Sequence, residues 1–424
     1  MEVDATAQAA LLPHEAIITT FGASSLDAEL LARFERVTGK RPHTLLRRGL
    51  FFAHRDFDRF LDAYERGQPI YIYTGRGPSS DSLHLGHLLP FIFTKYLQDA
   101  FDCHVVIQIT DDEKFLRDRF LTFDTVSKYA KENIRDIIAC GFNPEKTFIF
   151  INSDYMCRPP VYRLLCAVER MLSINQLRAT FGFEDASNVG YMSFPPKQIL
   201  PIYSSFFDGL SFTRVPVVTE ISTDDAPKKK TGKARKDAGV DATEVLAEIF
   251  PEASNYQKAT CLIPAGLEQD LYFRLGRDLA SRLGFPKCTQ LIGRFLPGLH
   301  GAESKMSASD PNNAIYLMDT PKMIKQKINK HAFSGGRDTV EEHRLHGANL
   351  DVDVSIKYLE VFLDSDEELE RIKTEYKAGR MLTGEVKKIL IELLGNLVEE
   401  HRARRAAVTD EQIAAFTSIS ARFG

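Results

Sequence analysis

Short apolar runs alternate with amphipathic stretches along the chain from residue 69 onward. The runs have the length of strands and lie at Ile70–Tyr73, Val105–Thr110, Thr147–Ile151 and Cys261–Pro264. The second run is nearly all β-branched, which is typical of a strand covered on both faces. Helical patterns lie between the runs, over Thr125–Ala139 and Pro160–Leu177. This order predicts an α/β fold with a parallel, doubly wound sheet over residues 69–320.

Beyond residue 320 the alternation stops and helical patterns take over. Capping-box sequences at Ser365–Glu368 and Thr409–Gln412 mark two helix starts. Between them, apolar residues recur with the helical period from Val386 to Val398, which predicts a helix with one wide apolar face. We therefore expect residues 321–424 to form a separate all-helical domain.

The first 68 residues are expected to form an N-terminal extension packed on the sheet domain. Helical spacing predicts helices over Asp27–Val37 and Asp56–Tyr64. Between them, the basic stretch His43–Arg48, together with Arg41, fits a solvated loop. A second basic run at 228–236, within the polar stretch 221–244, favours a surface insertion over a phosphate-binding loop.

Composition narrows the class of protein. The 424 residues are 44% hydrophobic and 26% charged with a formal net charge of −4, which is typical of a soluble globular protein without a global basic field for nucleic acid. No apolar run is long enough for a transmembrane helix, and the first ten residues do not resemble a secretory signal. Six cysteines show no CxxC pair and no Cys/His metal spacing. We therefore expect reduced thiols, a cytoplasmic protein and no structural metal.

The first candidate for chemistry follows the first predicted strand. A glycine-rich turn, Thr74-Gly75-Arg76-Gly77, precedes His84-Leu85-Gly86-His87 at the start of an apolar helix. The turn and the helix start offer unpaired N–H groups and a positive dipole end to a phosphate. Gly86 leaves room for a flat ring against the backbone. By itself, the histidine pair is equally consistent with half of a metal site or with polar residues at a helix start.

The second candidate is the small-residue loop 301–309, far downstream. This loop presents one lysine, Lys305, between serines. A lysine on such a loop suits a movable cation that meets developing negative charge, although a single lysine is more often a plain surface residue. The two motifs in this order, joined by a strand–helix pattern, are more specific than either motif.

The segments His84-Leu85-Gly86-His87 and Lys305-Met306-Ser307-Ala308-Ser309 resemble the HIGH and KMSKS signatures of class I aminoacyl-tRNA synthetases. The similarity is closer still to the eukaryotic-type cytosolic tryptophanyl-tRNA synthetase family, through further segments at 73–80, 108–114, 331–338 and 351–355. It covers about residues 15–424. The stretch near 205–258 is longer and more basic than the connection usual in that family.

The resemblance implies a Rossmann-type catalytic domain followed by a helical anticodon-binding domain, in a cytoplasmic homodimer. It implies activation of L-tryptophan with ATP and Mg²⁺ to tryptophanyl-adenylate and pyrophosphate, and then transfer to tRNA(Trp). By the same resemblance, the catalytic residues would be His84, His87 and Lys305. The ATP-binding residues would be Thr74, Gly75, Arg76, Gly86, Met306, Ser307 and Ser309. Tryptophan would be bound by Tyr73, Gln108, Glu113 and Gln269, and the anticodon by Arg337, Asp338 and Lys387.

Several of these residues also fit plainer roles. Tyr73 fits a core aromatic, Gln108 fits a polar residue at a strand end, and the three anticodon candidates fit salt bridges within their domain. A tyrosyl-tRNA synthetase shares the architecture, an inactive synthetase-like protein would only bind RNA or a partner, and a small adenylyltransferase would share the histidine motif. The chain contains no Trp residue, and the sequence does not decide whether this has a purpose.

Overall fold

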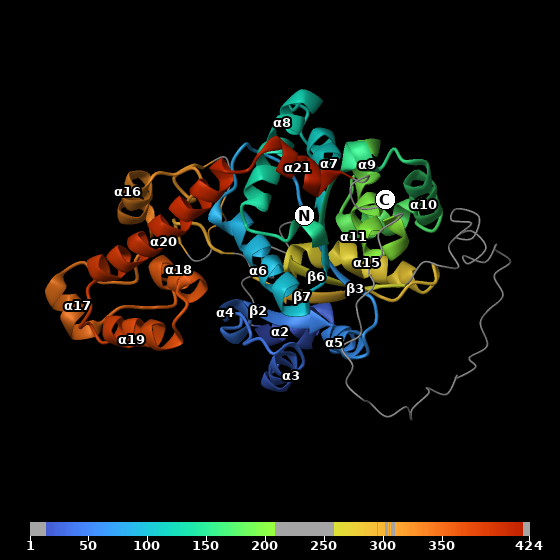
Figure 1. Ribbon diagram of the computed structural model, residues 1–424. Helices are drawn as coiled ribbons and strands as arrows, with labels where there is room; N and C mark the ends of the chain where they lie inside the picture. The colour runs from blue at the N-terminus through green and yellow to red at the C-terminus, as the bar shows by residue number, and fades with distance from the viewer. Residues whose placement is uncertain are drawn as a thin grey trace.

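Seven strands form one sheet in the part of the chain that the structure describes. Figure 1 shows the computed structural model, which describes residues 14–207, 258–294, 296–301, 304, 306 and 310–418. The strands are β1 (Ser24–Ser25), β2 (Phe51–Arg55), β3 (Ile70–Arg76), β4 (His104–Ile109), β5 (Thr147–Ile151), β6 (Thr260–Gly266) and β7 (Thr289–Gly293). Their order across the sheet is β1-β2-β7-β6-β3-β4-β5.

The five strands from β3 to β7 are parallel. The sequence predicts four of them, β3, β4, β5 and β6, but not β7. Strand β3 pairs with β4 on one side and with β6 on the other, and β4–β5 and β6–β7 complete the parallel set. The chain proceeds outward from β3 through β4 and β5, and then returns to β6 and β7 on the opposite side. Sheets of this kind bind ligands beyond the carboxyl ends of the strands where the order reverses. Here that position lies between β3 and β6.

Helices cover both faces of the parallel strands. They are α6 (Leu85–Phe101), α7 (Asp111–Arg117), α8 (Phe123–Ile138), α9 (Asn152–Tyr155), α10 (Pro159–Glu169), α11 (Ile174–Phe181), α12 (Val189–Met192), α13 (Phe194–Ile199) and α15 (Asp270–Ala280). Side chains alternate along β3, so Ile70 and Ile72 pack toward α6 and α8, while Tyr71 and Tyr73 pack toward α10, α13 and α15. The single helix predicted over 160–177 is wrong, because α10 ends at Glu169 and Ser173 caps a new helix.

The N-terminal segment contributes strands as well as helices, which the sequence pattern does not predict. Helices α2 (His14–Phe21), α3 (Ala28–Thr38), α4 (Thr44–Arg47) and α5 (Phe57–Glu65) surround β1 and β2. Strand β2 pairs antiparallel with β7 and so extends the parallel sheet at its edge. Phe51 and Phe52 are buried, and the ring of Phe51 stacks on Phe93 of α6 at a centroid distance of 4.1 Å. The extension therefore packs on the sheet by completing it.

Beyond residue 320 the described chain is helical. The helices are α16 (Pro321–His331), α17 (Val340–His346), α18 (Val354–Phe362), α19 (Asp366–Lys377), α20 (Thr383–Ala406) and α21 (Asp410–Thr417). The apolar stripe of α20 is confirmed, with Val386, Leu390, Leu394 and Val398 buried. The full capping box forms at Thr409, whereas Ser365 caps α19 without a reciprocal bond from Glu368. Division into domains at 68/69 and 320/321 stays a prediction, and the basic stretch 221–244 lies outside the described residues.

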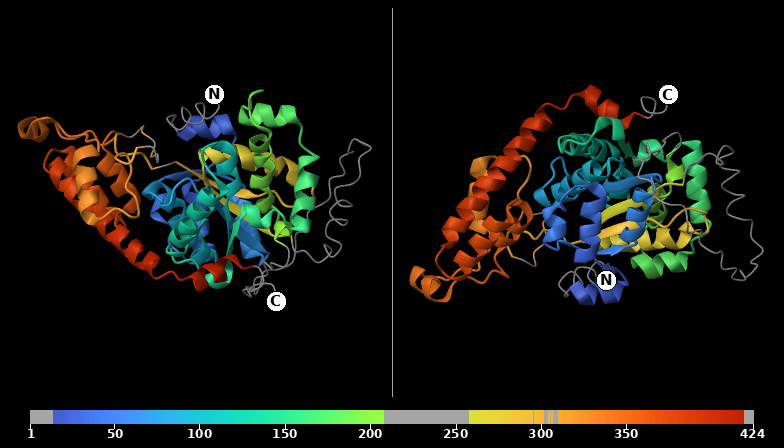
Figure 2. Two further views of the ribbon diagram at one scale, coloured as in Figure 1. Left: turned by 90° about the horizontal axis from the view of Figure 1, so that it is seen from above. Right: turned by 60° about the horizontal axis from the view of Figure 1, so that its bottom comes forward.

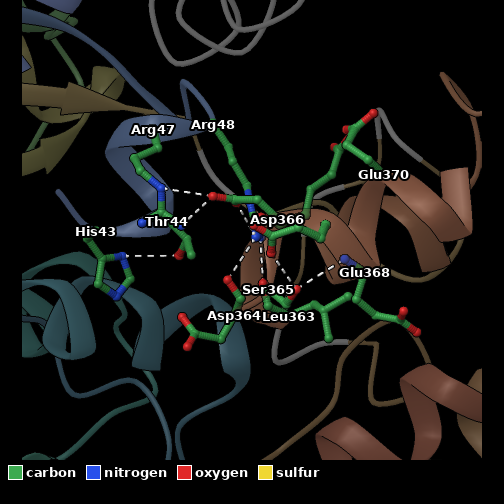
Figure 3. A network of polar contacts seen from close by, with 12 residues as sticks. His43, Thr44, Arg47, Arg48, Leu363, Asp364, Ser365, Asp366, Glu368 and Glu370 are labelled. Carbon is green, nitrogen blue, oxygen red and sulfur yellow. Dashed lines mark hydrogen bonds and ion pairs between the residues drawn. The ribbon is translucent and has the colours of Figure 1, made fainter. Parts of the chain in front are cut away.

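The basic stretch at 43–48 is not a solvated loop. Arg47 and Arg48 both bind the carboxylate of Asp366 at the start of α19, with N···O distances of 2.8 and 2.7 Å. Arg48 also donates to the carbonyls of Glu360 and Leu363. Figure 3 shows both guanidiniums reaching across to the segment 363–366. The solvated-loop interpretation is therefore wrong, because these arginines bind the N-terminal extension to the C-terminal helices.

A second contact joins the helices to the sheet domain through α8. Figure 2 shows the long helix α20 running from the group of α16 to α19 back to the sheet domain, where α21 follows it. Arg405 donates to the fully buried carboxylate of Asp136 at 2.8 Å, and Arg404 donates to the carbonyl of Ala139. Among the described residues, no helix combines the length and apolarity needed to cross a bilayer.

Candidate active site

The glycine-rich turn continues directly from β3. Gly75 pairs with Gln108 of β4, and a Cβ on Gly75 would lie 3.2 Å from the Gln108 carbonyl oxygen. At Gly77 a Cβ would lie only 2.4 Å from Cε of Lys114. Glycine at this position therefore lets a lysine of α7 lie against the turn. Lys114, which no sequence motif singles out, adds a second cation next to the turn that carries Arg76.

A buried asparagine holds the two ends of this turn. Asn133 of α8 accepts a hydrogen bond from Nε of Arg76 at 3.0 Å and donates one to the carbonyl of Ser80 at 2.8 Å. Burial lowers the pKa of Arg76 to about 10, and the carboxylates of Asp136 and Glu113 oppose that shift. The guanidinium therefore stays charged at neutral pH and is fixed in place.

The two histidines of the first motif stack at the start of α6. Their ring centroids are 3.5 Å apart with an interplanar angle of 23°. His84 is 5% exposed, and its Nδ1 has no hydrogen-bond partner among the described residues. Burial, followed by the nearby charge of Arg76, lowers the pKa of His84 to about 3. The imidazole is therefore neutral at pH 7 and retains one ring nitrogen as a donor and one as an acceptor.

The second motif packs on the first through Met306. A Cβ on Gly86 would lie 3.3 Å from Sδ of Met306, which is buried. Further along, Leu85 donates its N–H to the carbonyl of Ile315 at 3.0 Å, and His84 forms a β-bridge with Tyr316. The two signature segments therefore meet at the start of α6. Lys305, Ser307 and Ser309 lie outside the described residues.

The candidate tryptophan ligands Tyr73 and Gln108 contact each other. The hydroxyl of Tyr73 donates to Oε1 of Gln108 and lies 3.0 Å from the carbonyl of Gln198. Both side chains are fully buried, and the ring of Tyr73 packs edge-on against Phe273. An indole would therefore reach them only after a displacement that opens the site.

Glu113 and Gln269 follow the carboxyl ends of β4 and β6. Glu113 is buried on α7 and forms an ion pair with Lys114 at 2.8 Å. Gln269 ends a short 3₁₀ turn, η5 (Leu267–Gln269), and is half-buried. One turn later on α15, burial raises the pKa of Tyr272, with smaller contributions from Tyr191 and Glu113. Glu113 and Gln269 therefore follow two different strands at the same edge of the sheet.

The three anticodon candidates lie away from that edge. Arg337 and Asp338 are exposed on the segment between α16 and α17. Figure 1 shows α17 at the end of the molecule away from the sheet. Nε of Arg337 donates to the carbonyl of Gly347 at 3.2 Å. Lys387 donates to the carbonyl of Ala332 at 2.9 Å, and burial lowers its pKa. Lys387 thus caps the carboxyl end of α16.

The chain belongs to the tRNA synthetases class I (W and Y), where the letters stand for tryptophan and tyrosine. The model of that family matches residues 65–194 and 252–399. The cytoplasmic tryptophan–tRNA ligase of Homo sapiens is 48% identical over 412 residues, which are 97% of this chain and 78% of that protein. The cytoplasmic enzyme of Arabidopsis thaliana is 46% identical over 96% of this chain and 90% of its own length. The resemblance inferred from the signature motifs is confirmed.

Solved structures agree with these relatives. Tryptophanyl-tRNA synthetase from Giardia lamblia is 60% identical, with a TM-score of 0.89 and 96% of each chain covered. The enzyme from Encephalitozoon cuniculi, determined with bound tryptophan, is 36% identical, with a TM-score of 0.80 over 97% of this chain and 99% of that one. The fold predicted from the sequence, a Rossmann-type sheet followed by C-terminal helices, is therefore confirmed.

Several polar residues at this edge are not predicted from the sequence. Asn152, Asn133 and Gln198 come from three different helices and hold the predicted ligands in place. None belongs to a recognisable motif. For Asn152 a signal exists, because it directly follows β5 and the carboxyl ends of parallel strands meet at one edge of the sheet.

Proposed function

We propose that this protein is an ATP-dependent tryptophan–tRNA ligase. The observation that carries the proposal is the packing of Met306 against Gly86, because it brings both signature segments to one nucleotide site. The choice of tryptophan rests on the relatives, which are tryptophan–tRNA ligases. Their names also support a cytoplasmic location, and by family resemblance the protein acts as a homodimer.

The first reaction forms the adenylate. A carboxylate oxygen of tryptophan attacks the α-phosphorus of ATP, and the bond to the β,γ-pyrophosphate breaks in line. Positioning and charge neutralisation supply most of the rate in such phosphoryl chemistry. Bound Mg²⁺ would accompany the ATP phosphates and neutralise part of their charge. In the second reaction, a ribose hydroxyl at the 3′ end of the tRNA attacks the acyl carbon, and AMP leaves.

The residues around the start of α6 have distinct roles in this scheme. Thr74, Gly75 and the N-terminus of α6 offer backbone contacts to phosphate, and Gly86 leaves space for the adenine or ribose. His84 and His87 donate to the α-phosphate or the ribose. Because burial keeps the His84 imidazole neutral, it donates a hydrogen bond to the nucleotide without carrying a positive charge itself.

Cations complete the nucleotide site. Arg76, which Asn133 fixes beside His84, reaches a phosphate as a permanent charge. Lys305, on the loop that carries Met306, Ser307 and Ser309, follows the leaving pyrophosphate. A lysine that contacts the phosphates only as negative charge develops on them lowers the free energy of the transition state more than that of the ground state.

Tryptophan selectivity rests on hydrogen bonds to the indole N–H. A phenyl or phenol ring in place of indole loses about 50 Å² of buried apolar surface, worth about 1–1.5 kcal/mol or tenfold. Leaving the acceptor oxygen at Tyr73 or Gln108 without the indole N–H adds a larger penalty, because sites built around a substrate hydrogen bond reject its absence by about 10⁴–10⁵-fold in the tyrosine enzyme. Glu113 and Gln269 would hold the ammonium and carboxylate of the amino acid.

The C-terminal helices would bind the anticodon. Arg337 and Asp338 are exposed and together can donate to and accept from base edges, while Lys387 suits a phosphate or a base acceptor. Exposed bases in a single-stranded loop are the part of a tRNA that protein side chains can distinguish most readily.

Pyrophosphate exchange into ATP tests this function. Each of the twenty amino acids is supplied in turn with ATP and labelled pyrophosphate. The proposal predicts exchange with tryptophan and little with any other amino acid. Exchange with tyrosine in preference would assign a tyrosyl-tRNA synthetase, and no exchange with any amino acid would favour an inactive binding protein.

A further inference from the structure

Four polar side chains form a hydrogen-bonded row at the carboxyl edge of the sheet. Asp112 accepts at Oδ1 from Nδ2 of Asn152 at 2.8 Å. Asn152 accepts at Oδ1 from Nε2 of Gln108, also at 2.8 Å. Gln108 in turn accepts at Oε1 from the hydroxyl of Tyr73. The row therefore joins α7, α9, β4 and β3.

The first member of the row fixes the direction of all the others. An ionised carboxylate only accepts hydrogen bonds, and Asp112 is ion-paired with Lys197 at 3.2 Å. Asn152 must therefore turn its amide nitrogen toward Asp112, which leaves its oxygen facing Gln108. Gln108 must then donate its amide nitrogen to that oxygen, which leaves its own oxygen facing Tyr73.

The second amide hydrogen of Gln108 is bound by the backbone. Nε2 of Gln108 also donates to the carbonyl of Lys197 at 3.3 Å, so both amide hydrogens have acceptors. Its Oε1 keeps a second lone pair beyond the bond from Tyr73. Gln108 and Asn152 are both fully buried, so water does not substitute for a lost partner.

We propose that Asn152 is a positioning residue for tryptophan selectivity: it orients the amide of Gln108 so that an acceptor, and not a donor, faces the indole N–H. This inference rests on the proposed function. It gives Asn152 no contact with the substrate. With the amide of Gln108 reversed, an N–H would face the indole N–H, and neither group would have its acceptor.

The test compares tryptophan with an analogue that carries sulfur in place of the indole N–H, 3-(benzothiophen-3-yl)alanine. Pyrophosphate exchange gives kcat/KM for each substrate. In Asn152→Ala, kcat/KM for tryptophan should fall about tenfold or more, because a buried hydrogen bond is lost, while the value for the analogue changes much less. A purely structural role would lower both values equally, and that result overturns the proposal.

A charge-conserving exchange keeps the test decisive if the alanine variant does not fold. Asp112→Asn combined with Asn152→Asp moves the acceptor-only carboxylate one step along the row, where it again accepts from Gln108. The proposal predicts that this double variant keeps the preference for tryptophan, because a carboxylate at position 152 can only accept from Gln108 and so holds its amide in the same direction. Loss of preference in the double variant, with the protein folded, contradicts the proposal.

Gln98→Ala is a matched control. Gln98 is a buried amide of α6 that binds Thr147 and Asn143 and has no part in the row. This variant should have lower stability, with the ratio of the two kcat/KM values unchanged.

Failure of the wild-type protein to exchange with tryptophan would refute the proposed function, whereas normal exchange with an unmoved ratio in Asn152→Ala would refute only this inference.

Discussion

The imidazole of His84 is expected to stay neutral well below the pH at which histidine usually takes up a proton. Its side chain is 5% exposed, and burial beside the charge of Arg76 lowers its pKa to about 3. In the unfolded chain the pKa returns to about 6.5. Replacement by glutamine, His84→Gln, keeps a polar side chain and removes the titrating group.

The sign of the effect follows from where the proton binds. Between pH 6.5 and pH 3 the unfolded state holds the proton and the folded state does not, so the free energy of unfolding falls as the pH is lowered through this window. For a group with an unfolded pKa of about 6.5, the loss between pH 7 and pH 5 is about 2 kcal/mol. Above pH 7 this contribution is fully present.

Urea unfolding at pH 7 and pH 5 measures this loss in the wild-type protein and in His84→Gln. The wild-type loss should exceed that of the variant by about 2 kcal/mol. His43 and His54, whose pKa values burial also lowers, contribute equally to both proteins and cancel. Equal losses in both proteins, or an NMR titration of His84 with a midpoint near pH 6.5, would refute the reasoning.

Three further substitutions, one of them with a matched control, test other residues. Tyr73→Phe should weaken discrimination against phenylalanine in the exchange assay and lower stability by about 1–2 kcal/mol through the unpaired oxygen of Gln108; unchanged selectivity would remove Tyr73 from the indole contact. Lys305→Ala should slow activation about 10–1000-fold with tryptophan binding largely kept, and a comparable loss of affinity would contradict its role. Arg48→Ala should lower the free energy of unfolding by about 2–3 kcal/mol, whereas Arg41→Ala, at a 64% exposed side chain bound to the same aspartate, should cost less than about 1 kcal/mol; equal effects would rule out the part-buried contacts of Arg48 as the cause.

The parallel core of the sheet could be predicted because its strands are continuous apolar runs. Strands β2 and β7 could not, since their patterns are broken by polar residues such as Arg55 and Gln290. Gln290 is fully buried within β7, against the usual preference of a buried strand. The pairing of β2 with β7 joins segments distant in the sequence, which no local pattern encodes.

The nucleotide site could be predicted because its residues lie in two short motifs. The supports of that site come from separate elements, so only the fold brings them together: Asn133 from α8 and Asn152 from α9. Likewise, Arg47 and Arg48 looked like a solvated basic stretch, because their acceptor Asp366 lies more than three hundred residues later in the chain. Long-range ion pairs leave no signature in the local pattern of charge.

A crystal structure with tryptophan and a non-hydrolysable ATP analogue tests the central claim most directly. We expect the indole nitrogen within hydrogen-bonding distance of the hydroxyl of Tyr73 and Oε1 of Gln108, with the α-phosphate beside His84 and His87. Tyr73 and Gln108 would have to open from their fully buried state to admit the ring. An indole bound elsewhere, with the Tyr73–Gln108 pair still closed, would contradict the account.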